Sequence, residues 1–291
     1  MIKIGVVGTP GGWSSEALAD AVNDITGFRF LVDNEKISAN LADNRVMFDN
    51  VNLMALDGII IKKMGASYSP HLLDRLEILR FVNESGVRIF SAPEKIIRVL
   101  SRVTCTVTLR SAGIPMPDTT ITEDVDVALD VVKKYGEAVF KPIFSTKAKG
   151  MELIKDDDKA FDRIKAFKAE NQIMYLQKRI NHNGEDFGVT FLGGKYLTTY
   201  ARCSDGSSWN TTTRSGGKYK AYKPSSEIIS LAEKAQSLFG LDFTCVDVAE
   251  TEEGPKVFEV SAFGGFKGIA AATGIDAAKQ YAKFVIRELE K

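Results

Sequence analysis

The sequence predicts a protein of mixed α/β and α+β class, in which a parallel α/β unit comes first. Three observations lead to this prediction. Apolar strands alternate with helices over the first 92 residues, a pattern typical of a parallel sheet. Later strands are joined in pairs by glycine-containing turns, which is typical of antiparallel hairpins. The length of 291 residues exceeds one typical domain, so two or three lobes are expected.

The composition narrows the class of protein. Apolar residues make up 44% and charged residues 26% of the chain, as in ordinary soluble proteins. Lys plus Arg and Asp plus Glu both number 38, so no overall field attracts nucleic acid or an anionic membrane, and neither partner is expected. No apolar run is long enough for a membrane span or a signal peptide. The three cysteines are far apart, so we expect neither a disulfide framework nor a zinc site, and a cytoplasmic location.

The first unit is predicted to end at about residue 92. Its strands are expected at 3–8, 28–32, 57–62 and 87–90, with helices beginning near residue 14 and covering 70–84. The glycine-rich turn 8–12 lacks the G-x-G-x-x-G spacing of dinucleotide-binding proteins. It is equally well interpreted as a tight turn or as a loop that approaches a substrate.

The middle of the chain predicts a helix over 93–110, with Pro93 at its first position. A compact α+β module follows, with helices at 125–135 and 159–168 and strands at 138–141, 151–154 and 173–180. Lys141 ends the first of these strands, before a loop that carries Lys147 and Lys149. These lysines are interpreted either as a clamp for phosphates or as charges that solubilise a hairpin.

Two features precede the C-terminal strands. A hairpin over 187–202 turns at Gly193 and Gly194 and ends at Arg202. The polar loop 204–217 follows, and a long polar loop in a compact domain is usually a lid or a binding loop. A helix is then expected over 226–239.

The C-terminal hairpin is predicted to contain the chemistry. Its strands are 243–249 and 256–261, and a turn centred near Glu253 places Asp247 directly opposite Glu259 on one face. Ser261, two residues further along, lies on the same face. Two facing carboxylates repel, and Mg²⁺ shared with nucleotide phosphates would remove the conflict. The alternative is a pair of solvated surface carboxylates. A glycine-rich bend directly after the pair favours a ligand site.

The order of these parts resembles the ATP-grasp ligases, most closely the RimK-type carboxylate–amine ligases that add glutamate or similar amino acids to an acceptor. The resemblance is strongest at 177–186, 202, 241–247, 257–261 and 274–276. It implies an ATP-grasp fold with an N-terminal pre-ATP-grasp domain over 1–92, a central lobe over 93–177 and a C-terminal lobe over 178–291. The two lobes would clasp ATP between them.

The same resemblance implies a role for each matched residue. Asp247, Glu259 and Ser261 would bind Mg²⁺ or Mn²⁺, and Arg202 would face the transferring phosphoryl and acyl groups. The residues that would bind ATP are Arg102, Lys141 and Lys149 at the phosphates, Gln177, Lys178 and Ile180 at the adenine, and Asp186 at the ribose.

Four positions depart from the family pattern. Arg102 stands in place of a lysine, Lys178 in place of a glutamate and Ser261 in place of an asparagine. The phosphate loop 145–150 contains fewer glycines and more lysines than is usual. These departures bear mostly on the second metal ion, because a hydroxyl is a weaker ligand than an amide oxygen.

The implied reaction activates a substrate carboxylate as an acyl phosphate, with release of ADP, and then joins it to an amine. The partners would be ATP, a small-molecule or peptide carboxylate and an amine, and the residues Trp13, Trp209, Asn210 and Arg214 indicate a polar or anionic substrate with an apolar part. Two alternatives stay open: an ATP-binding protein with weak or no ligase activity, and a small-molecule kinase. The oligomeric state, monomer or homo-oligomer, is also open.

Overall fold

A computed structural model describes residues 2–146, 148–206, 209–212 and 216–291. The N-terminal unit contains a parallel sheet with the strand order β2-β1-β6-β7, as the alternating pattern predicts. Its strands are β1 (Ile4–Gly8), β2 (Leu31–Asp33), β6 (Gly58–Ile61) and β7 (Arg88–Phe90), and its helices are α1 (Trp13–Thr26) and α2 (His71–Glu84). The two helices cover opposite faces of the sheet, because Val6 packs with α1 and its neighbour Val7 packs with α2.

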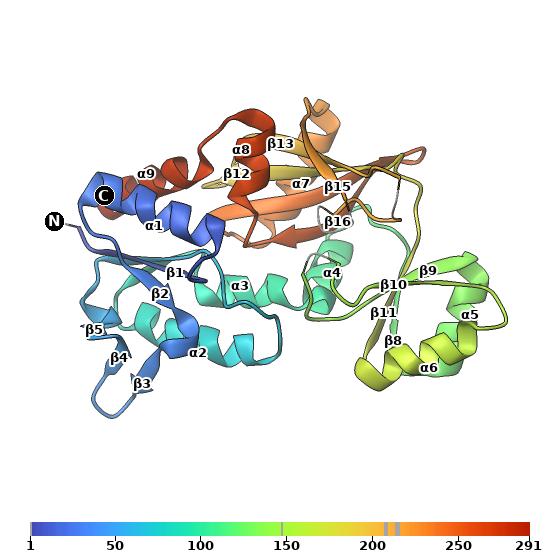
Figure 1. Cartoon of the computed structure of the whole chain (residues 1–291), viewed down its shortest axis with the longest axis horizontal. Helices are drawn as coiled ribbons and strands as arrows, with labels where there is room; N and C mark the ends of the chain where they lie inside the picture. Colours follow the sequence, from blue (N-terminus) through green and yellow to red (C-terminus); the bar gives the residue numbers. More distant parts are fainter. Residues whose placement is uncertain (1, 147, 207–208, 213–215) are drawn as a thin grey trace.

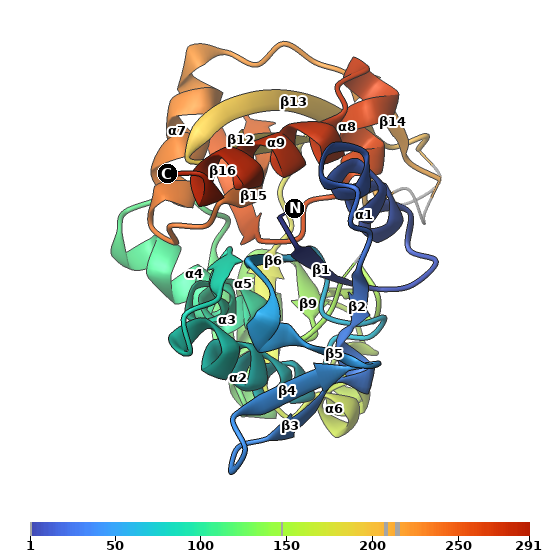
Figure 2. The same cartoon turned by 90° about the vertical axis from the view of Figure 1, so that its left-hand side faces the viewer.

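The sequence patterns gave no sign of a second, small sheet in this unit. It is antiparallel and consists of β3 (Ser38–Asn40), β4 (Arg45–Phe48) and β5 (Val51–Asn52), between the 3₁₀ helices η1 (Asn34–Lys36) and η2 (Leu53–Ala55). Figure 2 shows β3 and β4 at the bottom of the molecule, and Phe48 of β4 contacts Phe30, next to β2, with ring centroids 5.6 Å apart. Strands of two to four residues are too short for an alternating pattern to be recognised.

The predicted single helix over 93–110 is wrong. The chain forms α3 (Pro93–Leu100) and α4 (Arg102–Ser111), with an extended backbone at Ser101 between them. Serine favours helix ends because its hydroxyl competes for backbone hydrogen bonds. The break also frees the Arg102 N–H to donate to the carbonyl oxygen of Ile143 at 3.4 Å, so Arg102 begins a helix beside the central lobe.

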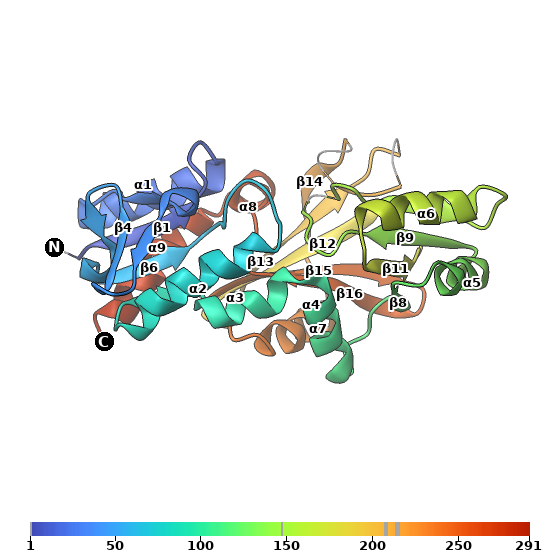
Figure 3. The same cartoon turned by 90° about the horizontal axis from the view of Figure 1, so that it is seen from below.

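The central lobe contains an antiparallel sheet with the strand order β10-β9-β11-β8. Its elements are β8 (Thr119–Thr122), α5 (Val125–Tyr135), β9 (Glu137–Lys141), β10 (Glu152–Lys155), α6 (Ala160–Glu170) and β11 (Met174–Lys178). Both helices pack on one face and enclose a separate core with the sheet. Figure 3 shows this lobe at the right, apart from the N-terminal unit.

The C-terminal lobe is organised around a five-stranded antiparallel sheet with the order β14-β13-β12-β15-β16. Its elements are β12 (Glu185–Leu192), β13 (Lys195–Cys203), β14 (Lys218–Ala221), α7 (Ser226–Ser237), β15 (Phe243–Thr251), β16 (Gly254–Ser261), α8 (Phe266–Thr273) and α9 (Ala277–Leu289). The predicted turn at Gly193 and Gly194 is confirmed, with φ angles of 57° and 76° that favour glycine. Helix α7 packs on one face of the sheet and α8 on the other.

The N-terminal unit and the C-terminal lobe share a core. Helix α9 packs against α1 (Figure 1), and Ile4 lies in the same cluster as Tyr281. Lys62, at the end of β6, is buried, and its Nζ donates to the Gly264 carbonyl oxygen at 2.5 Å and lies 3.8 Å from the centre of the Phe266 ring. The domain boundaries at 92 and 177 remain a prediction. None of the helices within the described ranges is long and apolar enough to cross a membrane.

Candidate active site

The strand register of the five-stranded sheet brings the predicted site residues together. Asp186 on β12 pairs with Arg202 on β13, and Asp247 on β15 pairs with Glu259 on β16. Gly188 links the rows, because it pairs with Asp247 on one side and with Tyr200 on the other. Directly opposed residues lie on the same face of a sheet. The predicted pairing of the two carboxylates is therefore confirmed.

The register of this hairpin has two parts. The turn closes between Thr251 and Gly254, half a residue before the predicted centre at Glu253. A β-bulge then restores the pairing, because Val257 stands opposite Val248 and leaves Phe258 without a partner in the ladder. As a result, the adjacent side chains of Phe258 and Glu259 both line the same cavity, which a regular strand would not allow.

This cavity lies between the central and C-terminal lobes and has a volume of about 330 Å³. All but one of the site residues predicted from the sequence line it: Arg102, Lys141, Gln177, Lys178, Ile180, Asp186, Arg202, Asp247, Glu259 and Ser261. They come from α4, β9, β11 and its following segment, β12, β13, β15 and β16. The fold thus collects at one place residues that are up to 159 positions apart in the chain, from Arg102 to Ser261.

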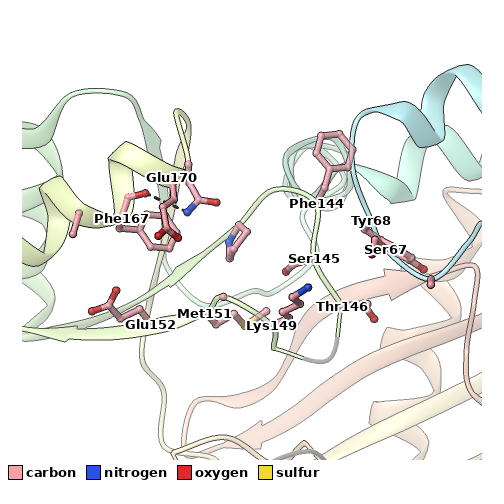
Figure 4. A pocket seen from close by; sticks show the side chains of 15 residues that line it. Ser67, Tyr68, Phe144, Ser145, Thr146, Lys149, Met151, Glu152, Phe167 and Glu170 are labelled. Atoms are coloured by element: carbon pink, nitrogen blue, oxygen red, sulfur yellow. Dashed lines mark hydrogen bonds between the residues drawn. The ribbon is translucent and has the colours of Figure 1, made fainter.

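Lys149 is the exception. It lines a neighbouring cavity of about 520 Å³, between Tyr68 of the N-terminal unit and the loop before β10. Figure 4 shows the Lys149 side chain among Ser145, Thr146 and Met151. These three residues line both cavities, so the two spaces adjoin at the phosphate loop. Lys147 lies outside the described residues.

Several residues of the cavity were not singled out as site residues from the sequence. Lys63 is the second residue after β6, at the carboxyl end of the parallel strands, where such sheets bind ligands. Tyr200 lies two positions before Arg202 on the same strand, so strand alternation would have placed it on the same face. Trp209 and Asn210 line the cavity as the loop prediction expects, whereas Trp13 is 51% exposed and lies elsewhere. Thr213 and Arg214 lie outside the described residues.

Arg202 contacts two of the carboxylates. Its Nε donates to Asp186 Oδ2 at 2.9 Å, and its Nη2 lies 2.9 Å from Asp247 Oδ1. The Thr211 hydroxyl also donates to Asp186, so the loop after β13 is tied to the cavity wall. The Asp186 carboxylate, predicted to bind the ribose, is therefore already hydrogen-bonded on both sides.

Arg102 contacts the remaining carboxylate. Its Nη1 lies 2.8 Å from Glu259 Oε2, and its side chain is 8% exposed. The same guanidinium donates to the carbonyl oxygen of Pro142 and to the Ser145 hydroxyl, both at 3.3 Å. Arg102 therefore connects β16 to the phosphate loop, and both predicted metal-binding carboxylates are paired with an arginine.

The environment of Asp247 suits a cation. Burial raises the pKa of its carboxyl to about 6, the Arg202 charge lowers it, and the nearby Glu259 charge raises it again. Carboxylate and hydroxyl oxygens are the ligands that Mg²⁺ prefers. Within the described ranges, no three Asp, Glu, His or Cys side chains are grouped closely enough to hold a metal alone. The donor set of Asp247, Glu259 and Ser261 thus fits an ion that takes further ligands from phosphates.

Lys141 is buried, and its Nζ donates to Gln177 Oε1 at 2.5 Å. Burial lowers the pKa of this lysine to about 7, helped by the Arg102 charge, and the Glu259 and Asp247 charges act in the opposite direction. An amide oxygen is a neutral partner, so the lysine charge is incompletely compensated until an anion binds.

Binding of ATP is expected to weaken as the pH rises above 7. A polyphosphate bound at Lys141, as the sequence predicts, would stabilise the charged form of the lysine and raise its pKa above that in the free protein. Binding would then have to take up a proton once the free lysine has lost it. Calorimetric titration of Mg-ATP should give a Kd roughly 10-fold weaker per pH unit above 7. Lys141→Arg stays charged over this range and should remove the decline. A pH-independent Kd in the wild-type protein would contradict the assignment.

The fold and the cavity define a class of protein. An α/β unit and two α+β lobes surround a cavity rich in cations and carboxylates, which is the arrangement of the ATP-grasp ligases. A RimK-like ATP-grasp domain matches residues 100–285, and the chain belongs to this family. It is accordingly an ATP-dependent ligase of the kind that forms carbon–nitrogen bonds. The resemblance and the fold class predicted from the sequence are confirmed.

Sequence and structure alignments with related proteins cover almost the whole chain. Tetrahydromethanopterin:alpha-L-glutamate ligase of Methanosarcina acetivorans is 27% identical, and the alignment covers 98% of this chain and 99% of that protein. The protein of the same name from Methanococcus maripaludis is 23% identical, with 96% of each covered. The ATP-grasp ligase PsnB, solved with a phosphomimetic variant of its minimal precursor, Mg and ADP, has a TM-score of 0.77 at 17% identity and covers 99% of both chains.

Proposed function

We propose that the protein joins the carboxylate of an acceptor to the amine of an amino acid, with glutamate as the first candidate, through an acyl phosphate. The observation that carries the proposal is the row Asp247–Glu259 in the cavity between the lobes, with Arg202 and Arg102 paired to it. The names of the relatives support glutamate as the amine. Mg²⁺ and ATP are the cofactors, as in the ligase solved with Mg and ADP.

ATP would lie along the cavity, with its adenine at the segment Gln177–Ile180 and its phosphates toward Asp247. Lys141 and Arg102 come from the central lobe and would contact the phosphate oxygens. The Lys141 ammonium group would act as a compact point charge, and the planar Arg102 guanidinium could donate two parallel hydrogen bonds. Mg²⁺ held by Asp247, Glu259 and Ser261 would neutralise charge on the same oxygens. The site suits one ion better than two, since Ser261 offers a hydroxyl, a weaker ligand than the amide oxygen of the asparagine usual at this position.

The chemistry proceeds in two displacements. An oxygen of the acceptor carboxylate attacks the γ-phosphorus in line, the bond to the bridging oxygen breaks, and ADP leaves. The amine nitrogen then attacks the acyl carbon, the carbon–oxygen bond to phosphate breaks, and the amine loses a proton. Arg202 would stabilise charge on the transferring groups once its partner Asp247 is held by metal.

The arginine pairs suggest how the ligand-free site stays intact. Arg102 and Arg202 supply positive charge to Glu259 and Asp247 while metal is absent, which lowers the cost of burying Asp247. With Asp247 and Glu259 holding Mg²⁺, the two guanidinium groups would be available to the phosphates. The same cations would thus serve both the empty and the loaded site.

The proposal is tested by measuring ADP release and product mass in the same reaction. The purified chain is incubated with Mg-ATP, L-glutamate and an acceptor panel that contains tetrahydromethanopterin and short peptides, with each component omitted in turn. The expected result is ADP release that requires acceptor and glutamate, with an amide product. A stable phosphorylated product without amine would establish a kinase, and Mg-ATP binding without turnover would indicate a regulatory ATP-binding protein.

A further inference from the structure

Tyr200 is a buried phenol in the cavity, and no role has been assigned to it above. It is 4% exposed and lines the same space as Asp247 and Glu259. The strand register puts it in line with them, because Tyr200, Gly188, Asp247 and Glu259 are paired in turn across four strands. The phenol therefore belongs to the row that carries the proposed metal ligands.

Two glycines make the space for the ring. A Cβ atom at Gly188 would lie 2.5 Å from Tyr200 Cζ and 2.7 Å from its hydroxyl, far inside contact distance. A Cβ atom at Gly268, on α8, would lie 3.1 Å from the Cε2 atom of the ring. The Tyr200 ring thus lies over Gly188, on the side of the sheet that faces the cavity, and its hydroxyl end is directed across β12 toward β15.

The hydroxyl has only a weak partner. Among the described residues, its hydrogen bond is with the Cys245 thiol, at an oxygen–sulfur distance of 3.7 Å. Sulfur is a weak acceptor, so a strong donor is left for another group. Burial raises the pKa of Tyr200 well above its usual value, and the nearby Cys245 adds to the rise, so the phenol keeps its proton at every working pH.

The hydroxyl also lies close to the reacting groups. The Cys245 thiol that it contacts is 3.8 Å from Asp247 Oδ1. The Arg202 guanidinium carbon lies 5.9 Å from the centre of the Tyr200 ring. A substrate group bound beside Asp247 and Arg202 would therefore lie close to the Tyr200 hydroxyl.

We propose that the Tyr200 hydroxyl donates a hydrogen bond to the acyl oxygen of the activated substrate and stabilises the oxyanion that forms when the amine attacks. The inference rests on the ligase function proposed above. The nitrogen–carbon bond forms, the carbonyl electron pair moves to the oxygen that Tyr200 faces, and the pair returns as phosphate leaves and takes up the proton that the amine loses. Tyr200 keeps its proton throughout, so no further reactant is needed. A neutral donor of this kind complements Arg202, which carries charge.

The test uses Tyr200→Phe, which removes the oxygen and keeps the ring. Steady-state ADP release and amide formation are measured with Mg-ATP, L-glutamate and the acceptor on which the wild-type chain is fastest. Loss of one oxyanion donor should lower kcat about 10²-fold. The Kd for Mg-ATP and the unfolding temperature should stay unchanged, because the hydroxyl contacts neither ATP nor a strong partner. Tyr196→Phe is the matched control on the same strand, since Tyr196 is exposed, does not line the cavity, and has its hydroxyl hydrogen-bonded to Thr199 at 3.1 Å.

A second variant tests the same inference by displacing the Tyr200 hydroxyl instead of removing it. Gly188→Ala retains the Tyr200 hydroxyl but forces the ring to move, so it should also lower kcat. The kcat of the double variant should be no lower than that of the slower single variant, because both substitutions remove the same interaction of the Tyr200 hydroxyl.

The outcomes separate the two proposals. A kcat for Tyr200→Phe within about twofold of the wild-type value would overturn the role of the hydroxyl while leaving the ligase function standing. A loss confined to the Kd for Mg-ATP would likewise overturn it and assign Tyr200 to nucleotide binding. No amide product from the wild-type chain across the panel would overturn the proposed function, and this inference with it.

Discussion

Replacing Glu259 by glutamine is expected to lower ADP release by at least about 10³-fold, because a metal ion contributes several kcal/mol of charge stabilisation to phosphoryl transfer and each 1.4 kcal/mol is worth about tenfold. The variant loses the negative charge that faces Asp247 across the hairpin but keeps nearly the same size. Arg102 keeps its hydrogen bonds to Pro142 and Ser145, so the fold should survive. Calorimetric titration should show that ATP binding no longer depends on Mg²⁺.

The control for this variant lies in the same hairpin. Glu253 is an exposed residue of the turn between β15 and β16, and it contacts Lys256. Glu253→Gln makes the same chemical change outside the cavity and should leave ADP release unaltered. If Glu259→Gln retained more than about a tenth of wild-type turnover, the reaction would not depend on a metal at this hairpin.

Replacing Arg202 by methionine should affect both turnover and stability. The change leaves Asp186 and Asp247 without their shared cation, and Asp186 is 6% exposed at its side chain. Breaking a buried ion pair by removing one partner costs about 3–5 kcal/mol. Turnover should fall by about 10³-fold as the charge on the transferring groups loses its partner. Denaturant unfolding and ADP release measure the two effects separately.

A second arginine of the chain serves as the comparison. Arg80 on α2 also contacts two carboxylates, those of Glu77 and Glu84, but it is 40% exposed and far from the cavity. Arg80→Met should leave the stability nearly unchanged, as is usual when a solvent-exposed ion pair is removed. Mg²⁺ should stabilise Arg202→Met more than the wild-type chain, because metal binding replaces the missing charge. Equal stabilisation of both proteins by Mg²⁺ would contradict the view that arginine and metal share these carboxylates.

The C-terminal hairpin shows how far sequence reasoning can reach. The alternation of the strands and the turn residues predict the pairing of Asp247 with Glu259, and the structure has it. The prediction assumed a regular ladder, whereas the true pairing combines an earlier turn with a bulge at Phe258. The two deviations cancel from this pair onward, because a bulge shifts the register from its own position, and the pairs between the turn and the bulge stay out of the predicted register. A periodic pattern does not contain that information.

Other differences arise from contacts between distant segments. The break at Ser101 is accompanied by a tertiary acceptor, the Ile143 carbonyl, which no local pattern reports. Lys149 lies in the neighbouring cavity because the shape of the phosphate loop depends on the packing of the lobes. Tyr200 could have been found from its position two residues before Arg202, but its seat over Gly188 depends on the register of β12. Most residues of the candidate site could thus be predicted from the sequence, but the residues that they contact could not.

The division of the hydrophobic cores determines which parts of the molecule should unfold together. One core joins α1 to α9 across nearly the full length of the sequence, whereas the central lobe encloses a core of its own. The molecule should therefore behave as two bodies, with α1 and α9 packed in the core of the larger one. Amide hydrogen exchange would show the first and last helices opening together, at the free energy of global unfolding, and the central lobe opening separately. Deletion of α1 or α9 should therefore unfold the larger body rather than release a stable fragment.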